Sequence, residues 1–464
     1  MKIIRNIILI LSIFVFFISS LENYLIIGAG PVGLYLAHQL LEKSHSSYVE
    51  ILEGRSFSRL QCIRLPYYIA SRFPQEIKQV LWPIQSIREM LFTKFSIIDK
   101  KISTYLGYQH FPRISVGNLQ KTLKEYMQSK YFSRFKFIHR EADITLIQEQ
   151  SQSDRKIIFF TAGGGAFNDG VRKDLNILNK KFDFAKNTDI LDGVYLIYRN
   201  VRDGSPLDKI DEDYIRDGQF MNRIELSRKG LTYSATNNEQ RDVQLYTYPI
   251  GELKDIYNEI PASIKTSASF PKGINYKTGN TILEQPTEEL TIAEKDSNKK
   301  ENEWLQKLRT ALDKLFAEFK IYIPSHANIH YAKRMQYAFE KTNEKNRNGV
   351  DVVFVGDAMG GTDYKYGLNL GRGLYSAYNL VEFLVNNPAN VPHALEEYQK
   401  YWDTVVDTEF GDPNKDLIAD PAIFYKYVIM GRTIDGKEYG PYDFQAYSVL
   451  SSKKLKKRIK RKIK

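Results

Sequence analysis

YLIIGAGPVGLYLA, residues 24–37, is the stretch that decides the fold of this chain, and VEILE, residues 49–53, follows it closely. The order predicts an apolar strand, a glycine turn, the start of a helix and a second strand that ends in an acid. That acid lies about 20 residues after the last glycine, which is the spacing of a dinucleotide-binding fingerprint. The two segments together are therefore a far more specific signal than three glycines alone.

Each residue of the fingerprint has a physical reason. Gly28 permits the tight turn, Gly30 lets the backbone approach a pyrophosphate, and Gly33 allows the helix to lie close to the strand. The positive N-terminus of the helix then faces the phosphates, and Glu53 is placed to accept hydrogen bonds from a ribose. The sequence therefore predicts a bound dinucleotide.

Net charge gives no support for nucleic-acid binding. The chain has 464 residues and a formal charge of +11, and residues 453–464 alone carry nine Lys or Arg and no acid. That basic tail contains no aromatic residue on which a base could stack, so no nucleic acid is expected. Leu455, Ile459 and Ile463 would share one side of a helix, which suits an anionic membrane surface or an acidic partner. A disordered, solubilising tail is the alternative.

The N-terminal residues 1–22 form a separate segment. A basic start precedes an apolar run from Ile7 to Ile18, and Ser19 and Ser20 follow. This pattern is typical of a secretory signal, and an uncleaved membrane anchor is the alternative. We therefore expect a protein of the secretory pathway, secreted or membrane-associated.

The domain organisation follows from two glycine turns that lie far apart in the sequence. The strand at Val352–Val355 ends in Gly356-Asp357-Ala358, and GLNLGRG at residues 367–373 opens a helix that is expected to run to about Val385. We predict an α/β fold in which a Rossmann-like domain (23–189 and 331–386) is interrupted by an antiparallel sheet lobe (190–330). A helical region (387–452) and the basic tail (453–464) follow.

Alternating, aromatic-rich segments predict the antiparallel sheet of the lobe, for example at 194–198, 222–226 and 243–249. The polar stretch 285–303 is expected to be a surface loop before a helix with Trp304 on its apolar side. The charged run 340–349 predicts an exposed hairpin turn.

Three further motifs resemble the class A flavoprotein monooxygenases of the para-hydroxybenzoate hydroxylase fold, and most of all the flavin domain of the MICAL proteins. EGRSFSR at 53–59 resembles a MICAL run that is one residue longer. ISVGNLQ at 114–120 resembles Ile-Ser-Ile-Arg-Gln-Leu-Gln, and the spacing of the glycine turns within 356–373 is also kept. The resemblance covers roughly residues 23 to 385.

The resemblance implies that FAD lies extended across the domain. Glu53 would hold the adenosine ribose, Arg55 and Arg59 would lie along the cofactor, Asp357 would bind a ribityl hydroxyl, and Gln120 would lie near the isoalloxazine. The helix opened by Gly367 would direct its positive end at the flavin N1–C2 edge. The expected cofactor-binding residues are Gly28, Gly30, Gly33, Glu53, Arg55, Arg59, Gln120, Asp357, Gly367 and Asn369.

The implied reaction is the insertion of one oxygen atom through a flavin C4a-hydroperoxide, with NAD(P)H as reductant and molecular oxygen as co-substrate. Because the cofactor carries this chemistry, no side-chain nucleophile is expected. The substrate would be an electron-rich small molecule or a protein side chain.

The chain departs from the family at several positions. Gly163-Gly164 stands where Asp-Gly is usual, Asn369 where a glycine is usual, and Met359 where a histidine is usual. Since the missing Asp is tied to nicotinamide contacts, an FAD oxidase or reductase with another electron donor is an alternative. A non-catalytic, membrane-associated flavin-binding protein is a third. His326 and His330 lie four apart without a following glutamate, and no metal site is expected.

Overall fold

The computed structural model describes the parts of the chain whose placement is defined. These are residues 22–55, 57, 62–63, 65, 69, 72–81, 114–151, 157–162, 166–177, 179–183, 191–201, 231–235, 240–247, 252–259, 274–275, 292–318, 321, 323, 327–333, 337–361, 368–409, 432–434 and 437–439. The N-terminal segment, the basic tail and residues 222–226 lie outside this part of the chain, so the predictions made for them stay predictions.

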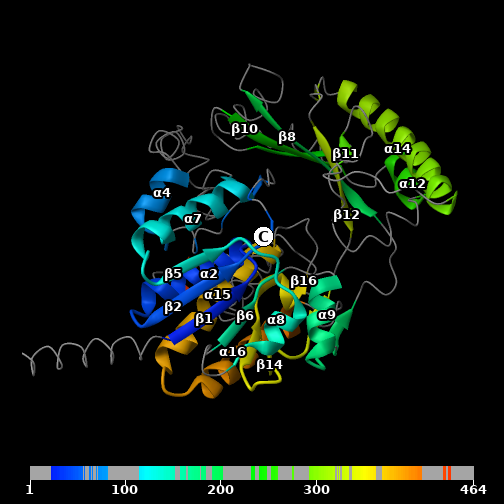
Figure 1. Cartoon of the computed structure of the whole chain (residues 1–464). Coiled ribbons are helices and arrows are strands. Elements are labelled where there is room, and N and C mark those ends of the chain that lie inside the picture. Colours follow the sequence, from blue (N-terminus) through cyan, green and yellow to red (C-terminus); the bar gives the residue numbers. More distant parts are fainter. Residues whose placement is uncertain are drawn as a thin grey trace, which may run out of the picture.

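A six-stranded, mainly parallel sheet forms the centre of the lower half of the molecule in Figure 1. Its strands come from both ends of the described chain and follow the order β14-β15-β6-β1-β2-β5. Only the β14–β15 pair is antiparallel. The strands are β1 (Glu22–Ile27), β2 (Ser47–Leu52), β5 (Phe135–Ile138), β6 (Ile157–Phe160), β14 (Asn343–Lys345) and β15 (Asp351–Phe354).

Both faces of this sheet are buried, as expected for parallel strands linked by crossover helices. Alternate residues of β6 show it: Ile157 and Phe159 enter one apolar cluster, and Ile158 and Phe160 enter the other. The first cluster joins the sheet to α2, α7 and α15, and the second joins it to α8 and α9. The helices are α2 (Pro31–Lys43), α7 (Val116–Lys130), α8 (Ile144–Glu149), α9 (Ala166–Asp174), α15 (Leu368–Asn386) and α16 (Val391–Glu409). Helix α16 contributes side chains to both clusters.

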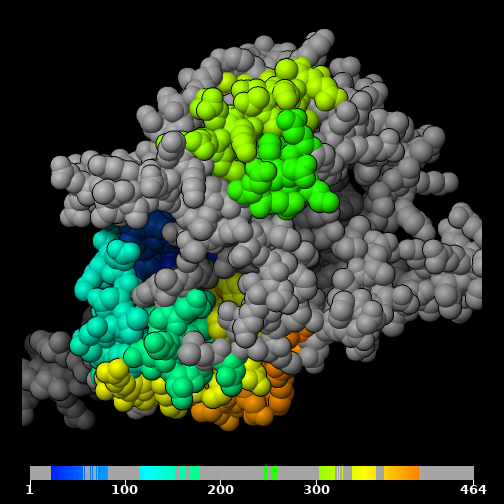
Figure 2. Space-filling view, turned by 90° about the vertical axis from the view of Figure 1, so that its right-hand side faces the viewer, coloured from blue at the N-terminus to red at the C-terminus, as the bar shows by residue number. Residues whose placement is uncertain are grey.

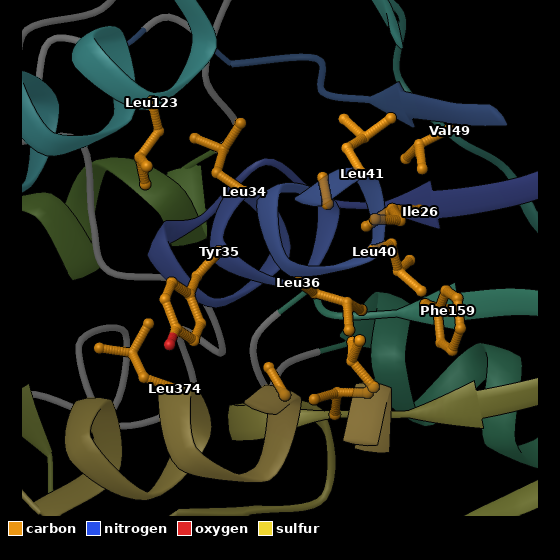
Figure 3. Packing of buried hydrophobic residues seen from close by; sticks show 14 of the residues in the cluster. Ile26, Leu34, Tyr35, Leu36, Leu40, Leu41, Val49, Leu123, Phe159 and Leu374 are labelled. Atoms are coloured by element: carbon orange, nitrogen blue, oxygen red, sulfur yellow. The ribbon is translucent and has the colours of Figure 1, made fainter. Parts of the chain in front are cut away.

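Helix α2 is buried along most of its length, from Gly33 to Leu41. Figure 3 shows Leu36 and Leu40 turned toward Ile26 and Phe159 of the sheet, while Leu34 lies toward Leu123 of α7. A buried Leu or Phe side chain contributes about 1.5–3 kcal/mol relative to an exposed one, so this packing fixes the helix firmly on the sheet. Arg134 holds the other end, since its guanidinium donates to the carbonyl oxygens of Ser44 (2.8 Å) and Leu41 (3.1 Å).

A second, antiparallel sheet lies in the upper half of Figure 1, in the order β11-β12-β8-β10-β9. Two helices lie beside it, and Figure 2 shows them next to each other on the surface. Trp304 of the longer helix donates its indole N–H to Ile256 O of the shorter one (2.7 Å). The elements are β8 (Leu191–Val201), β9 (Leu231–Ala235), β10 (Gln240–Thr247), β11 (Ile274–Asn275), β12 (Asn328–Lys333), α12 (Glu252–Asn258) and α14 (Ile292–Glu318).

Small elements complete the described chain. A three-stranded sheet in the order β16-β13-β7 lies beside the end of β15, where a short 3-10 helix, η2, follows. The remaining elements are β3 (Cys62–Ile63), β4 (Ile114–Ser115), α4 (Gln75–Leu81), β7 (Lys180–Asp183), β13 (Tyr337–Phe339), η2 (Gly356–Ala358), β16 (Gly360–Gly361), β17 (Arg432–Ile434) and β18 (Lys437–Tyr439).

One expectation about the lobe is wrong. The polar stretch 285–303 was expected to be a loop, but α14 already begins at Ile292. Its first part reads IAEKDSNKKENE, in which three Glu and three Lys are straight-chain residues that lose little side-chain freedom in a helix. High helix propensity therefore extends the helix beyond its apolar stripe. The expected hairpin before β15 is confirmed, because β14 and β15 pair through the turn at Asn346–Gly349.

Candidate functional site

The first glycine turn joins β1 to α2. Gly28 has φ of +101°, a conformation that favours glycine, and its N–H donates to Leu52 O on the neighbouring strand (2.8 Å). The Thr161 hydroxyl donates to Gly28 O (2.7 Å) from the end of β6. Three adjacent strands therefore hold this turn in place.

Gly33 is required for the close approach of helix and turn. A Cβ at this position would overlap Gly28 O and would lie 2.5 Å from Thr161 Oγ1. Because backbone atoms cannot move aside cheaply, only glycine fits here. The role predicted for Gly33, close packing of the helix on the strand, agrees with these contacts.

Gly30 is different, because nothing in the protein requires glycine there. Its φ is −62° and ψ is 172°, which any residue can adopt, and an added Cβ would meet no atom within 4 Å. Gly30 is also the N-cap of α2, and its cap has no side-chain hydrogen bond. The first intrahelical bond runs from Leu34 N to Gly30 O, so the preceding N–H groups of Val32 and Gly33 remain for an external acceptor. Open space beside an uncapped helix N-terminus is a site for an anion such as phosphate.

Glu53 lies at the end of β2 with its side chain only 5% exposed. Its carboxylate accepts from Ala29 N (3.0 Å) and Arg55 N (3.0 Å) and forms an ion pair with Arg55 Nε (3.0 Å). Burial alone raises the pKa of this carboxyl, but the Arg55 bonds and charge and the two backbone donors outweigh it and hold the pKa below its ordinary value. Glu53 is therefore ionised at neutral pH and is an acceptor for hydroxyl groups.

Gln120 contacts the same turn from the opposite side. It lies in α7, whose N-cap Ser115 accepts from Asn118 N (3.3 Å), and its Nε2 donates to Ala29 O (2.6 Å). Its Oε1 is buried and has no hydrogen-bond partner among the residues that the structure describes. An unsatisfied buried acceptor is costly, about 1–3 kcal/mol, so this atom is placed for a donor from a ligand or water. Ala29 is thus held on its N–H by Glu53 and on its carbonyl by Gln120.

The second glycine turn lies directly beside the first. Gly356, at the end of β15, has φ of +68°, and a Cβ there would lie 3.1 Å from Val32 Cγ1 in α2. A Cβ at Gly373 of α15 would lie 2.7 Å from Val32 Cγ2 and 3.3 Å from Gly356 Cα. Two segments that are far apart in the sequence therefore meet at the N-terminus of α2.

Asp357 lies within this second turn and is partly exposed, while its neighbours Gly356 and Ala358 are buried. The Tyr337 hydroxyl donates to the backbone carbonyl of Asp357 (2.7 Å) and helps to fix the turn. The turn thus leaves one carboxylate side chain at the surface of the site.

The two turns lie at the carboxyl ends of two parallel strands, β1 and β15, with β6 between them. In sheet order β15, β6, β1 and β2 end in Gly356, Thr161, Gly28 and Glu53 respectively. With strands about 4.8 Å apart, these ends span about 14 Å along one edge. Such an edge is where open α/β sheets bind their ligands. The open space at Gly30, the unpaired Gln120 Oε1 and the ionised Glu53 fit the diphosphate and ribose of a dinucleotide such as FAD.

The remaining predicted residues are less defined. Arg55 pairs with Glu53 and its side chain is 58% exposed. Asn369 lies in the first turn of α15, which begins at Leu368 as the expected helix does. Arg59 and Gly367 lie outside the described residues, and so does the Gly163-Gly164 pair.

Sequence reasoning gave no role to two residues that the structure places near the turns. Thr161 was only the residue before a glycine cluster, yet its hydroxyl bridges β6 to the first turn. Arg172 follows the altered Gly163-Gly164 motif in the sequence, and it is fully buried and donates to Ala358 O (2.7 Å). Asp169, Lys173 and Asp174 lie close to Arg172 in the sequence, so no local pattern indicated that this arginine is buried.

Within the described ranges, no three His, Cys, Asp or Glu side chains are grouped so that they could hold a metal ion. The helices of those ranges are also too short or too polar to cross a bilayer.

No protein-family model matches the sequence, and no curated protein does either. Among solved structures, the chain aligns with PqsL, a probable FAD-dependent monooxygenase from Pseudomonas aeruginosa, with a TM-score of 0.46 and 12% identity over 88% of this chain and 96% of PqsL. It aligns with the tetracycline destructase Tet(55) with a TM-score of 0.43 and 10% identity, over 93% and 95% of the two chains.

CtdE, which was solved in complex with FAD and a substrate, gives a TM-score of 0.41 and 11% identity over 93% of this chain and 98% of CtdE. These three structures do not include MICAL, and the likeness to MICAL stays a prediction. The functional assignment rests on the residues of the two glycine turns.

Proposed function

We propose that this protein is an FAD-dependent monooxygenase that uses NAD(P)H and inserts one atom of molecular oxygen into an electron-rich substrate. The observation that carries the proposal is Gly30. It is a glycine that neither its backbone conformation nor any neighbouring atom requires, and it caps a helix whose first N–H groups have no side-chain partner. A ligand phosphate supplies the missing reason for both features.

The residues of this chain would hold FAD in an extended form along the sheet edge. Glu53 would accept from the adenosine ribose, the turn at Gly28 to Gly33 would receive the diphosphate, and Asp357 would bind the ribityl chain. Gln120 Oε1, which lacks a donor among the residues that the structure describes, would accept one hydrogen bond from the cofactor. FAD would supply the oxygen chemistry, and the protein would bind, orient and shield it.

A second candidate is an FAD oxidase or reductase with a different electron donor. The specific observation in its favour is Gly163-Gly164 at the position where the resembled family has Asp-Gly. Both candidate functions are compatible with secretion or membrane association through residues 1–22 and the basic tail 453–464. A localisation experiment tests this directly.

The first test is FAD binding by full-length Gly30→Ala. The added methyl group would meet no atom within 4 Å, and alanine caps a helix less well than glycine, so the unliganded variant should lose no more than about 1 kcal/mol of stability. It should bind FAD at least about tenfold more weakly, since about 1.4 kcal/mol of steric cost falls on the ligand. Gly170→Ala in α9 is the matched control: its Cβ would meet only the end of the Ile144 side chain, and FAD affinity should not change.

The second test separates the candidate reactions. Wild-type protein loaded with FAD is mixed with NADPH, and flavin absorbance and peroxide release are followed. Flavin that is reduced by NADPH supports the monooxygenase. Flavin that dithionite reduces and NADPH does not would contradict NAD(P)H use and favour the second candidate.

A further inference from the structure

Arg172 is a buried charge at the second glycine turn. Its side chain is 0% exposed, and its guanidinium lies between the rings of Phe339 (3.6 Å to the centroid) and Phe354 (3.8 Å). Burial lowers its pKa to about 9, with smaller opposing effects from Tyr337 and Asp169, so the group is still charged at neutral pH. An apolar site thus contains a full positive charge.

The protein compensates this charge only in part. Arg172 Nη2 donates to Ala358 O (2.7 Å) and contacts Met359 Sδ (3.4 Å), and the two rings contribute cation–π attraction. Its Nε and Nη1 have no hydrogen-bond partner, and no carboxylate forms an ion pair with it among the residues that the structure describes. Asn168, one turn earlier in α9, also leaves its Oδ1 without a partner. A buried charge without a counter-charge is costly to the folded protein.

The position of Arg172 shows which part of a bound dinucleotide would lie nearest. Glu53 ends β2, the first glycine turn ends β1, and Arg172 binds the turn that ends β15, at the other side of the sheet edge. If the adenosine ribose of FAD lies at Glu53 and its diphosphate lies at Gly30, the flavin half of the cofactor lies toward Arg172. Reduction by two electrons and one proton gives the flavin one additional negative charge at neutral pH.

We propose that Arg172 is a positioning residue of the flavin site, which holds the Gly356–Ala358 turn through Ala358 O and supplies the positive charge that stabilises the reduced, anionic cofactor. This inference rests on the proposed function. The unliganded protein carries the cost of the buried charge, and binding and reduction of FAD relieve it. Electrostatic interactions at such a depth are stronger than at the surface, because water does not screen them.

The test compares Arg172→Met and Arg172→Lys in the full-length protein. Met has a similar size and no charge, whereas Lys keeps the charge. For Arg172→Met we expect an unliganded melting temperature at least as high as that of the wild type, because an apolar residue replaces an uncompensated charge. FAD should bind at least about tenfold more weakly, and the midpoint potential of bound flavin should shift to a more negative value. In Arg172→Lys, the midpoint potential of bound flavin should lie close to that of the wild type.

Arg134→Met is the matched control. This arginine also donates to backbone carbonyls, at the far end of α2, and its loss should lower the melting temperature without moving the flavin potential.

The proposal is overturned if Arg172→Met lowers the melting temperature of the unliganded protein while FAD affinity and the potential of bound flavin are unchanged. It is also overturned if Arg172→Met does not fold and Arg172→Lys, with a lowered melting temperature, binds FAD as tightly and with the same potential as the wild type. Either result would assign Arg172 a structural role like that of Arg134. Wild-type protein that binds no FAD would be a different failure, because it would overturn the proposed function itself and this inference with it.

Discussion

Gly356 packs directly on Val32: a Cβ on Gly356 would lie 3.1 Å from Val32 Cγ1, and Gly356 has φ of +68°. Val32 is in the first turn of α2, the helix that follows the N-terminal glycine turn. Gly356 is the first residue of the second glycine turn. This contact brings together the two segments that would share one cofactor. The Rossmann-like domain is therefore completed only when the chain returns at β15, after the antiparallel lobe.

Gly33→Ala should disrupt the fold itself, unlike Gly30→Ala. Its Cβ would overlap Gly28 O and would lie 2.5 Å from Thr161 Oγ1, so the turn or the helix must shift. Overpacking of this kind costs about 1–3 kcal/mol or more. Thermal unfolding of the unliganded variant measures the loss. A Gly33→Ala protein as stable as the wild type would show that the helix lies farther from the turn than the structure has it.

Glu53→Gln should weaken FAD binding and remove a pH-dependent part of the stability. The pKa of this carboxyl is lowered on folding, so its contribution is present above the ordinary pKa of 4.5 and is lost as the pH falls through the lower folded value. The variant should therefore be less stable than the wild type at pH 7, and the difference should shrink in acid. Denaturant unfolding at several pH values checks this. A difference that grows as the pH falls would contradict the assigned sign.

His38 should make the protein sensitive to mild acid. It is buried in α2 beside Tyr35, Phe73 and Tyr126, and burial lowers its pKa from 6.5 to about 4. Glu42 opposes this shift, while Lys130 and Lys43 reinforce it. The unfolded chain takes up a proton below pH 6.5, and the folded chain does so only near pH 4. The free energy of unfolding should have its full value above pH 6.5. It should fall by up to about 3 kcal/mol as the pH falls from 6.5 to about 4.

His38→Leu provides the test of that acid sensitivity. Leucine has a similar size and does not titrate, so the variant should show a flatter stability profile between pH 6.5 and 4. Unfolding free energies at four or five pH values suffice. An unchanged slope would mean that other groups cause the acid sensitivity.

Asp357→Ala should reduce FAD retention while the chain stays folded. The side chain is partly exposed, and the turn around it is fixed by backbone contacts such as that from the Tyr337 hydroxyl (2.7 Å), which the substitution keeps. We expect a loss of about tenfold in affinity, typical of a lost hydrogen bond from a ligand hydroxyl to a carboxylate. Gel filtration followed by the ratio of flavin to protein absorbance measures retention. Full retention would remove Asp357 from the site.

Local signals predicted the dinucleotide-binding part of the fold well. The strand, turn, helix and acid of residues 24–53 are all present, because glycine positions and apolar runs act within a few residues of one another. Ser115 caps α7 as its type predicts. The first part of the helical region expected at 387–452 is confirmed by α16 (Val391–Glu409).

Interactions between distant residues could not be predicted. The start of α14 lies inside a polar stretch because helix propensity, rather than an apolar stripe, decides it. The contact of Gln120 with Ala29, 91 residues away in the sequence, depends on how the elements pack. Arg172 gave the weakest signal and has the most unusual environment, since only the tertiary structure places Phe339 and Phe354 on either side of it.

The most direct test of the central claim is a titration of the purified full-length protein with FAD, followed by the change in flavin fluorescence. We predict that the wild type saturates at one FAD per chain. Gly30→Ala and Asp357→Ala should each bind FAD more weakly, and the protein that carries both substitutions should bind it most weakly. Absence of saturable FAD binding in the wild type would contradict this prediction. A loss of affinity in only one of the two variants, Gly30→Ala or Asp357→Ala, would also contradict a single cofactor held by both glycine turns.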